Sequence, residues 1–361
     1  MNTEVLVVGA GPVGLLLAGD LAAAGMAVLV ADRLPEPMAE SRASQLSTRT
    51  AELLAERGLE GLLAEATPEP AGHFAGLSFP LTSVGGPWAG NWKVPQFRTE
   101  AALTARATAL GVRILRPYEL VGLSGDGVAR FRGGAEVRAD WVVGCDGVAG
   151  AVRGLAGFAV DRVPPTRELL RADVVGIEVP TRRFERTGRG LAVAMTRDGV
   201  TRVMVHQLGR PPAPRTGPPA FAELVGQWRA VTGDDLSAGT AIWLDAFDNE
   251  RGLVTDYRRG RVLLAGDAAH WHLPIGGQAL NVGLQDAAAL GAALPAGRLD
   301  DYATQRRRAA AVIGAVTAQE ELLLGGPPVD PLRAVLADLV RLPAAAGTLA
   351  RGTARQEWRL P

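Results

Sequence analysis

The stretch Gly266–Asn281 brings together residue types that can hold a flat, charged molecule. Asp267 follows the apolar residues 261–265, which predict a buried strand that would deliver this acid to the edge of a sheet. Gly276 and Gly277 would let the backbone come very close to a bound group. The alanine- and leucine-rich residues after them predict a helix, whose positive dipole end would point at the same place. This pattern indicates a site for a cofactor that becomes negative during its chemistry.

The N-terminus carries a second strong motif, Gly9-Ala10-Gly11-Pro12-Val13-Gly14. It follows the continuous apolar run Val5–Val8, which is typical of a strand in a parallel sheet. Residues 15–24 predict a helix, and residues 27–31 predict a second strand that ends in Asp32. Three glycines in this spacing, with an acid about 20 residues further on for a ribose hydroxyl, form the complete dinucleotide-binding fingerprint.

Neighbouring residues indicate which dinucleotide the site takes. Arg33 could bind the 2′-phosphate of NADP, but Asp32 beside it would repel that phosphate, so the site favours the unphosphorylated ribose of FAD or NAD. A further buried strand runs into an Asp146-Gly147 turn, with Arg153 shortly after it. Together with Gly266-Asp267 this gives two additional acid–glycine turns, which a simple nicotinamide dehydrogenase does not need. The motifs therefore favour FAD.

The order of the three motifs resembles the single-component FAD-dependent aromatic hydroxylases, the p-hydroxybenzoate hydroxylase-like (class A) flavoprotein monooxygenases. Pro274–Asn281 is most similar to the branch that acts on aromatic polyketides and related antibiotics. The segments that carry the resemblance are Gly9–Gly14, Cys145-Asp146-Gly147, Gly266–His270, Pro274–Asn281, 42–54 and Val94-Pro95-Gln96. The resemblance covers most of residues 1–295.

The resemblance implies a set of FAD-binding residues: Gly9, Gly11, Pro12, Val13, Gly14, Asp32, Arg33, Arg42, Gln96, Asp146, Gly266, Asp267, Pro274, Gly277, Ala279, Leu280 and Asn281. It implies that Asp32 binds the adenosine ribose and that Asp267 holds the ribityl chain or the pyrophosphate. Arg33, Arg42 and Gln96 would contact adenosine, pyrophosphate or ribityl chain, and the Asp146 turn is linked to both FAD and NADPH. Pro274 through Asn281 would line the isoalloxazine ring, with Pro274, Gly276 and Gly277 nearest to its chemistry. No residue is assigned as a catalytic base or nucleophile.

The resemblance also implies an α/β fold, with a Rossmann-like FAD-binding domain, an interleaved β-sheet substrate domain and a C-terminal helical segment. The expected boundaries are 1–71, 94–165 and 256–300 for the FAD-binding domain, 72–93 and 166–255 for the substrate domain, and 301–361 for the helices. Ala279 departs from the glycine that is usual in the family and would place a methyl group beside the flavin. Many relatives continue into a thioredoxin-like domain that the given residues lack, so the substrate pocket is expected to be open or completed by another subunit, as in a homodimer.

Composition excludes several other classes of protein. Lys and Arg number 38, as do Asp and Glu, so there is no basic excess of the kind that nucleic-acid binding requires. Cys145 is the single cysteine, which rules out a disulfide framework and fits a reducing cytoplasm. The N-terminus lacks the basic region of a signal peptide, and no apolar run reaches the roughly 18 residues of a membrane span. A cytoplasmic protein without membrane or nucleic-acid partners is expected.

Two other clusters have plainer interpretations. His270 and His272 could be metal ligands, but no acid or cysteine cluster accompanies them in the sequence, so packing beside the cofactor is favoured and no metal is expected. Arg306-Arg307-Arg308 could bind the phosphates of NADPH, although a solvated helix face is the more common role of such a run. A second Gly-x-Gly-x-x-Gly is absent from the sequence, so NADPH would bind transiently.

The sequence therefore predicts a monooxygenase that uses NADPH (or NADH) and O₂. It would hydroxylate a polycyclic aromatic or phenolic small molecule through a C4a-hydroperoxyflavin. Baeyer–Villiger oxygenation by the same flavin is an alternative, because the intermediate can also act as a nucleophile. A redox-silent FAD-binding scaffold in a biosynthetic complex is the alternative from another class. Pocket chemistry rather than fold has to decide among them.

Overall fold

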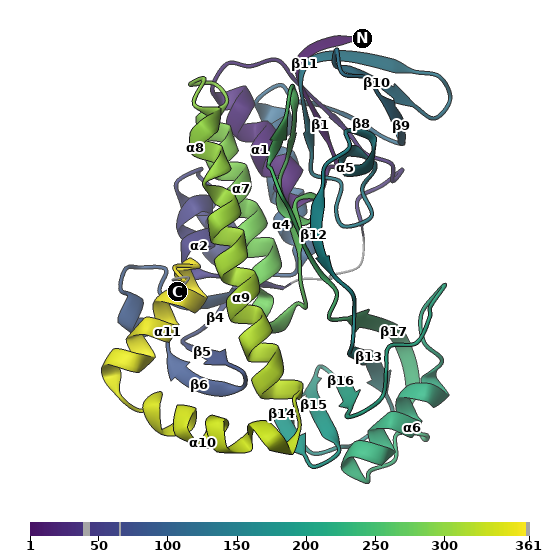
Figure 1. The fold of residues 1–361 in the computed structure, drawn as a ribbon, viewed down its shortest axis with the longest axis vertical. Coiled ribbons are helices and arrows are strands. Elements are labelled where there is room, and N and C mark those ends of the chain that lie inside the picture. The colour runs from purple at the N-terminus through teal and green to yellow at the C-terminus, as the bar shows by residue number, and fades with distance from the viewer. Residues whose placement is uncertain (39–43, 65, 359–361) are drawn as a thin grey trace.

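A parallel sheet forms the centre of the protein, as seen in a computed structural model that describes residues 1–38, 44–64 and 66–358 (Figure 1). Its strands, in spatial order, are β19 (Arg258–Arg259), β20 (Val262–Leu264), β11 (Glu136–Gly144), β1 (Asn2–Val8), β2 (Val28–Ala31) and β8 (Arg113–Leu115). β19 pairs antiparallel with β20, and β9 (Leu120–Leu123) and β10 (Val128–Phe131) extend the sheet beside β11. The carboxyl ends of β1, β2, β11 and β20 lie at one edge, because these strands run parallel.

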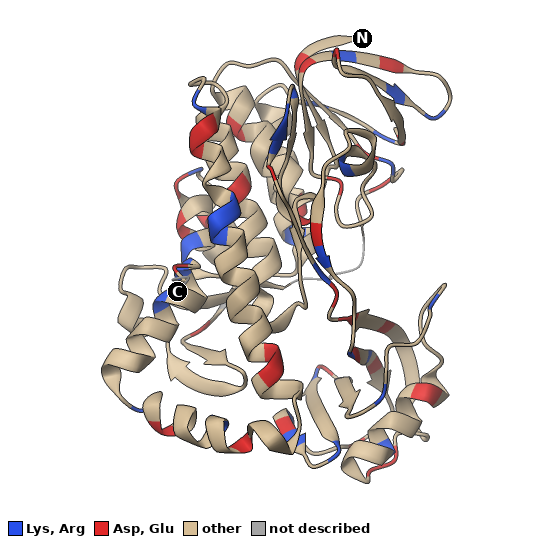
Figure 2. Ribbon diagram, in the orientation of Figure 1, with Lys and Arg blue, Asp and Glu red and all other residues tan. Residues whose placement is uncertain are grey.

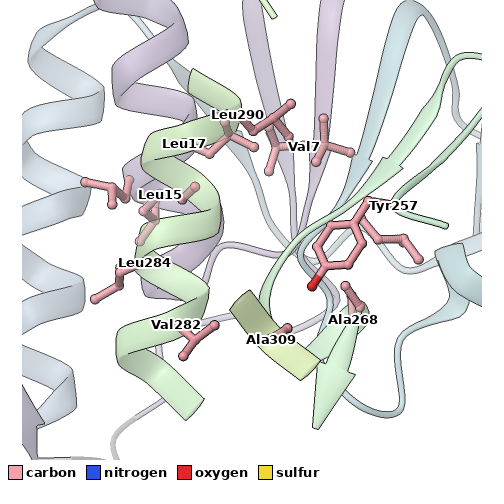
Figure 3. Close-up of a cluster of buried hydrophobic side chains, with 14 of the residues drawn as sticks. Val7, Leu15, Leu17, Tyr257, Ala268, Val282, Leu284, Leu290 and Ala309 are labelled. Atoms are coloured by element: carbon pink, nitrogen blue, oxygen red, sulfur yellow. The ribbon is translucent and has the colours of Figure 1, made fainter. Parts of the chain in front are cut away.

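Apolar residues explain why β1 lies in the middle of this sheet. Val7 is fully buried and has Val30 on one side and Val143 on the other. Helices α1 (Pro12–Ala23), α4 (Gln96–Ala109) and α7 (Gln278–Ala293) pack around it, and α1 contacts both of the others. Figure 3 shows Leu17 of α1 next to Leu290 of α7, with Leu15 and Leu284 in the same cluster, all fully buried. A parallel sheet needs such covering, because its strands are apolar on both faces.

A second, antiparallel sheet lies in the other half of the molecule (Figure 1). Its strands, in spatial order, are β14 (Arg182–Thr187), β15 (Gly190–Arg197), β16 (Val200–Gln207), β13 (Glu168–Val175) and β17 (Thr240–Asp248). Helix α6 (Phe221–Thr232) covers one face through the fully buried Trp228. The other face faces the main core, because Leu169 and Leu191 belong to that core. This sheet therefore stands between α6 and the half of the chain that contains the parallel sheet.

The apolar residues within 173–179 predict a strand there, but the strand that forms lies earlier in the chain. β13 begins at Glu168 and ends at Val175, since Gly176 has a φ of +76° and turns the chain away. The pairing of β13 with β17 begins at Glu168, which supports the earlier start. The Arg-rich β14 was not predicted, because exposed and half-buried residues alternate there without an apolar pattern.

Short elements connect the two halves. The short strands are β3 (Gln45–Leu46), β4 (Thr67–Glu69), β5 (Ala71–Phe74), β6 (Leu77–Pro80), β7 (Asn91–Lys93), β12 (Val160–Val163), β18 (Arg251–Val254) and β21 (His270–Trp271). The short helices are α2 (Thr48–Ala55), α3 (Glu60–Ala64), α5 (Ala151–Leu155), and the 3₁₀ turns η1 (Thr82–Val84), η2 (Gly266–Ala268) and η3 (Ile275–Gly277). β18 follows β17 directly and pairs with β21, so the antiparallel sheet is tied to the residues after Asp267.

The C-terminal part of the described chain is mostly helical, as predicted. Its elements are α8 (Leu299–Ala303), α9 (Gln305–Leu324), η4 (Pro327–Val329), α10 (Asp330–Leu339) and α11 (Pro343–Arg355). Figure 1 shows α9 running beside α7, with α10 and α11 returning toward the small hairpin of β5 and β6. The predicted α/β class with an added antiparallel sheet and C-terminal helices is confirmed, while the domain boundaries stay a prediction.

Charged residues are distributed without a strong bias of sign. Lys and Arg are interspersed with Asp and Glu over both halves of the ribbon (Figure 2). Many pair with each other at the surface, as Arg132 does with Glu119, and such exposed pairs contribute little to stability. Within the described residues, no helix combines the length and the apolar character that crossing a membrane would require.

The packing of α1 on the sheet gives a test of the fold. A Cβ at Gly14 would lie 2.0 Å from the carbonyl oxygen of Gly9, so Gly14→Ala should lower the free energy of unfolding by roughly 2–3 kcal/mol. The matched control is Gly226→Ala in α6, where a Cβ would meet no described atom within 4 Å. That control should gain roughly 0.5–1 kcal/mol from helix propensity. Urea unfolding measures both, and equal effects at the two sites would contradict the packing.

Candidate functional site

Three turns meet at the carboxyl edge of the parallel sheet: the glycine turn (residues 9–14), the Asp146 turn (residues 145–150) and the Asp267 turn (residues 266–270). The first two are in direct contact, because a Cβ at Gly9 would lie 2.3 Å from the carbonyl oxygen of Cys145. The first and third are joined by Val13, whose side chain would be 3.1 Å from a Cβ at Gly266. Motifs that are far apart in the sequence therefore form one site.

The glycines of the first motif have different roles. Gly9 has a φ of +109°, which favours glycine, and Gly14 allows α1 to approach the turn closely. At Gly11 a Cβ would meet no described atom within 4 Å, so this residue borders open space at the N-terminus of α1. A fingerprint glycine that leaves room for the pyrophosphate, beside the N–H groups of a helix end, fits a dinucleotide.

Asp32 lies where the fingerprint predicts an acid. Its carboxylate accepts hydrogen bonds from the N–H groups of Ala10 (2.6 Å) and Leu34 (2.8 Å), so it also braces the glycine turn. Arg33 is exposed. Arg116, which the sequence analysis missed, lies 3.3 Å from Asp32 and donates to the carbonyl oxygen of Ala10. The available signal was its position just after β8, the strand next to β2, whose end delivers Asp32.

Arg42 and Gln96 are the other two residues predicted to contact adenosine, pyrophosphate or ribityl chain. Arg42 lies outside the described residues. Gln96 is the first residue of α4 and is half-buried. Their contacts with FAD stay predictions.

Asp146 turns back onto its own chain. Its Oδ2 accepts a hydrogen bond from the N–H of Val152 (3.0 Å) at the start of α5. A Cβ at Gly150 would lie 2.2 Å from this carboxyl group, so the turn is tightly wound around it. Burial raises the pKa of Asp146 more than its backbone hydrogen bonds lower it. Asp146 thus fixes the turn that the glycine turn packs against.

Asp267 is exposed to solvent although protein surrounds it closely enough to raise the pKa of its carboxyl, mainly by desolvation. The turn is fastened from below by Asp286 of α7, whose Oδ2 accepts from the N–H of Gly266 (3.1 Å) and from Nε2 of His270 (2.7 Å). Asp286 was missed by the sequence analysis, because nothing in its helical pattern marks it.

Gly276 and Gly277 form a left-handed bend before α7, with φ values of +70° and +66°. The carbonyl oxygen of Gly276 accepts from Nε2 of Gln45 (3.0 Å), and that of Gly277 accepts from Nδ2 of Asn281 (2.6 Å). Asn281 is fully buried and is part of the scaffold that holds this bend. The N-terminus of α7 lies directly behind the bend.

The remaining residues predicted to line the ring are accessible. Pro274 is exposed, and Ala279 and Leu280 are half-buried at the first turn of α7. The methyl group of Ala279 therefore lies where a ligand can reach it. Two helix N-termini, two acids and a glycine bend lie at this edge of the sheet, and they fit the groups of FAD.

His272 and Arg306 both contact other parts of the protein. No three His, Cys, Asp or Glu side chains gather there as a metal site would require. His272 is buried with its pKa lowered to about 4 by desolvation, and its Nδ1 contacts the carbonyl oxygen of Leu273. Arg306 donates to the carbonyl oxygen of Val254 and pairs with Asp161, so it is engaged in packing.

The His270–Asp286 pair predicts a pH dependence. Burial alone would lower the pKa of His270, but Asp286 and Asp267 together raise it above its usual value of about 6.5. The stabilisation is therefore complete below about pH 6.5 and is lost as pH rises through the raised pKa. The melting temperature of the wild type should fall more steeply above that pH than that of His270→Gln. Parallel curves would contradict a charged pair.

Comparison with known proteins agrees with the geometry. A family model described as "FAD binding domain" matches residues 2–314. The rifampicin monooxygenase of Streptomyces venezuelae is 38% identical over 372 residues, covering 93% of this chain and 75% of its own length. The dialkyldecalin synthase of Streptomyces rugosporus is 34% identical over 370 residues, covering 97% and 80%.

Among solved structures, CabE, an aromatic hydroxylase from angucycline biosynthesis, matches with a TM-score of 0.91 and 36% identity. The match covers 100% of this chain and 77% of CabE. The predicted family and the predicted cofactor domain are thereby confirmed. This chain belongs to the FAD-binding family and, within it, to the FAD-dependent monooxygenases of the aromatic polyketide hydroxylase branch.

Proposed function

We propose that this protein is an NAD(P)H- and O₂-dependent hydroxylase of an electron-rich polycyclic aromatic or phenolic substrate. The single observation that carries the proposal is the meeting of the glycine turn, the Asp146 turn and the Asp267 turn beside the N-terminus of α7. The names of the rifampicin monooxygenase and of CabE support the substrate class by likeness. A bound FAD would supply the oxidation chemistry, which is the activation of O₂ by a flavin that a nicotinamide has reduced.

The residues of this chain would hold the cofactor from end to end. Asp32, with Arg116 next to it, would bind the adenosine ribose, and the space at Gly11 would admit the pyrophosphate against the N-terminus of α1. Asp267 would hold the ribityl chain or the pyrophosphate. The Gly277 bend would bring the dipole of α7 to the ring, where it stabilises negative charge on the reduced flavin.

The substrate would lie against the face of the antiparallel sheet that is turned away from α6. On this face Arg171 lies over the ring of Trp243, 4.7 Å from its centre, and over that of Phe247, 5.2 Å away. Arg171 also pairs with Asp245 (2.9 Å). Trp243 and Asp245 also line an open surface hollow at the edge of β17, together with Arg215 and Pro218 of the loop before α6. The aromatic rings of Trp243 and Phe247, with the guanidinium of Arg171 fixed beside them, are suited to stack on a flat, electron-rich ring.

A second function has a specific observation in its favour. The dialkyldecalin synthase covers nearly the whole chain at 34% identity, and its name describes the formation of a carbon ring system rather than an oxygenation. The same fold could therefore bind a substrate in the conformation that favours ring closure, with an FAD that is not reduced and reoxidised. The three turns would bind FAD in either case, so turnover distinguishes the two functions.

The deciding experiment measures NADPH and NADH oxidation by the FAD-loaded protein with a panel of tetracyclic phenols. A matching substrate should accelerate oxidation roughly tenfold or more, because substrate completes the site, and the product should carry one oxygen atom from labelled O₂. The label's position separates a new ring hydroxyl from a ring-expanded lactone. Two results together would favour the second function over the hydroxylase: neither NADPH nor NADH reduces the bound FAD, and a substrate is cyclised without being oxidised.

A further inference from the structure

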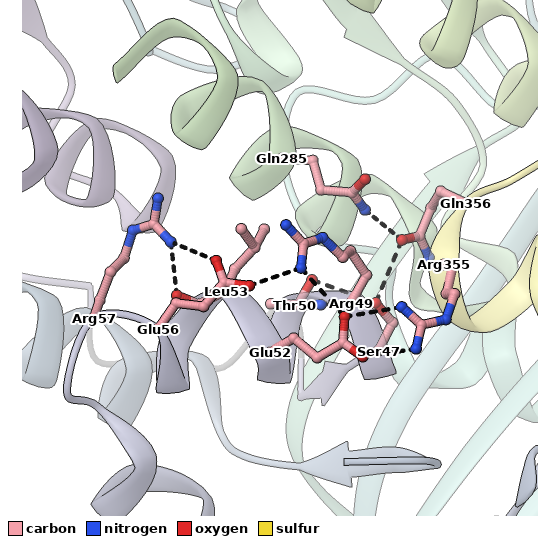
Figure 4. Close-up of polar contacts among 10 residues, drawn as sticks. All are labelled: Ser47, Arg49, Thr50, Glu52, Leu53, Glu56, Arg57, Gln285, Arg355 and Gln356. Atoms are coloured by element: carbon pink, nitrogen blue, oxygen red, sulfur yellow. Dashed lines mark hydrogen bonds and ion pairs between the residues drawn. The ribbon is translucent and has the colours of Figure 1, made fainter. Parts of the chain in front are cut away.

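A buried amide lies where the last described helix ends. Gln356 follows α11, is 2% exposed, and reaches Gln285 of α7 (Figure 4). Its Oε1 accepts from Gln285 and from the hydroxyl of Ser47, the residue that caps α2. Its Nε2 donates to Oε1 of Gln278 (3.0 Å) and to the carbonyl oxygen of Thr353 (2.9 Å). A glutamine amide has two donors and two acceptor positions, so all four are used.

The backbone of Gln356 indicates that this side chain matters. Its φ is +56° and its ψ is +33°, the left-handed conformation that costs free energy for a residue other than glycine. The comparable position after α6 is occupied by Gly233, with a φ of +88°. A glycine at position 356 would relieve the strain and would also remove the amide. Such strain persists only where the surroundings over-determine it, and it is frequent at functional sites.

The bonds of Gln356 lead directly to the Gly276–Gly277 bend. Gln278, held by Gln356, donates its Nε2 to the carbonyl oxygens of Gly276 (3.1 Å) and Thr353 (3.3 Å). Gln45 donates to the same Gly276 oxygen. The side-chain amides of Gln45 and Gln278 therefore hold the carbonyl of Gly276 pointing toward Gln356 and its hydrogen-bonding partners. Because a trans peptide is planar, the N–H of Gly277 points to the opposite side, where it donates to the carbonyl oxygen of Pro274 (3.4 Å).

We propose that Gln356 is a positioning residue for the flavin, which sets the orientation of the Gly276–Gly277 peptide through Gln278. The inference rests on the proposed flavin site at this bend. The C-terminal helix α11 thereby acts on the cofactor without touching it. The amide network fixes the peptide that joins Gly276 and Gly277, and with it the position of the bend beside which the ring would lie. Small displacements of peptide dipoles beside a flavin change how strongly its negative, reduced form is stabilised.

A second clamp between the same elements provides a control. Arg355 donates to both carboxylate oxygens of Glu52 in α2, at 2.7 and 2.9 Å, and the pair is half-buried (Figure 4). It ties the end of α11 to the body of the protein as Gln356 does. No hydrogen bond from Arg355 to the Gly276–Gly277 bend is found among the described residues, so breaking this clamp loosens α11 while leaving the amides in place.

The experiment compares Gln356→Met with Arg355→Gln in the FAD-loaded protein. Methionine matches glutamine in length but cannot hydrogen-bond in the network. Gln356→Met should raise the FAD dissociation constant about tenfold, since Gln278 loses a buried partner, and should shift the visible absorption bands and the reduction potential of the bound flavin. Arg355→Gln should lower the melting temperature and leave the bands and the potential at wild-type values.

The proposal is overturned if Gln356→Met lowers stability but leaves the dissociation constant, bands and potential unchanged, or if both variants shift the flavin alike. Should Gln356→Met fail to fold, Gln356→Asn replaces it: asparagine tolerates the left-handed backbone but is one methylene shorter and cannot span Gln278 and Gln285. The flavin shift is expected there too, and its absence would be equally decisive. A wild type that binds no FAD would instead refute the proposed function.

Discussion

The structure depends on the close approach of backbone segments that only glycine permits. A Cβ at Gly9 would lie 2.3 Å from the carbonyl oxygen of Cys145, and a Cβ at Gly14 would lie 2.0 Å from that of Gly9, both too close for a side chain. Val13 fills the gap to Gly266, and a Cβ at Gly283 of α7 would lie 2.9 Å from that valine. Strands, helices and turns are therefore locked together at one edge of the sheet. The geometry of the cofactor site is a direct consequence of this packing and not an addition to it.

Buried polar groups then hold the turns in a single conformation. Asp32 braces the glycine turn through the N–H of Ala10, and Asp286 joins both ends of the Asp267 turn. Buried hydrogen-bonded groups of this kind are costly to break, because a lone partner would stay desolvated. Gln356 extends the same principle to the bend before α7. The N-termini of α1 and α7 and the space at Gly11 can therefore receive an anion.

The sequence predicted what is local and missed what is distant. The glycine turn, Asp32 and the Gly277 bend are marked by spacing within a few residues, so their elements were found with nearly correct bounds. Arg116, Asp286 and Gln356 were not found, since each acts on a residue far from it in the chain. A lone arginine after a strand or a glutamine after a helix has no periodicity to mark it. Only the folded chain brings such residues to their partners.

The most direct test of the account is the affinity of Gly11→Val for FAD. In the protein without FAD a Cβ at this position meets no described atom within 4 Å, so the variant should melt at nearly the wild-type temperature. The added side chain would occupy the space required by the pyrophosphate, and the FAD dissociation constant should rise at least about tenfold, measured by flavin fluorescence. Wild-type affinity in a folded variant would show that the glycine turn does not receive the cofactor.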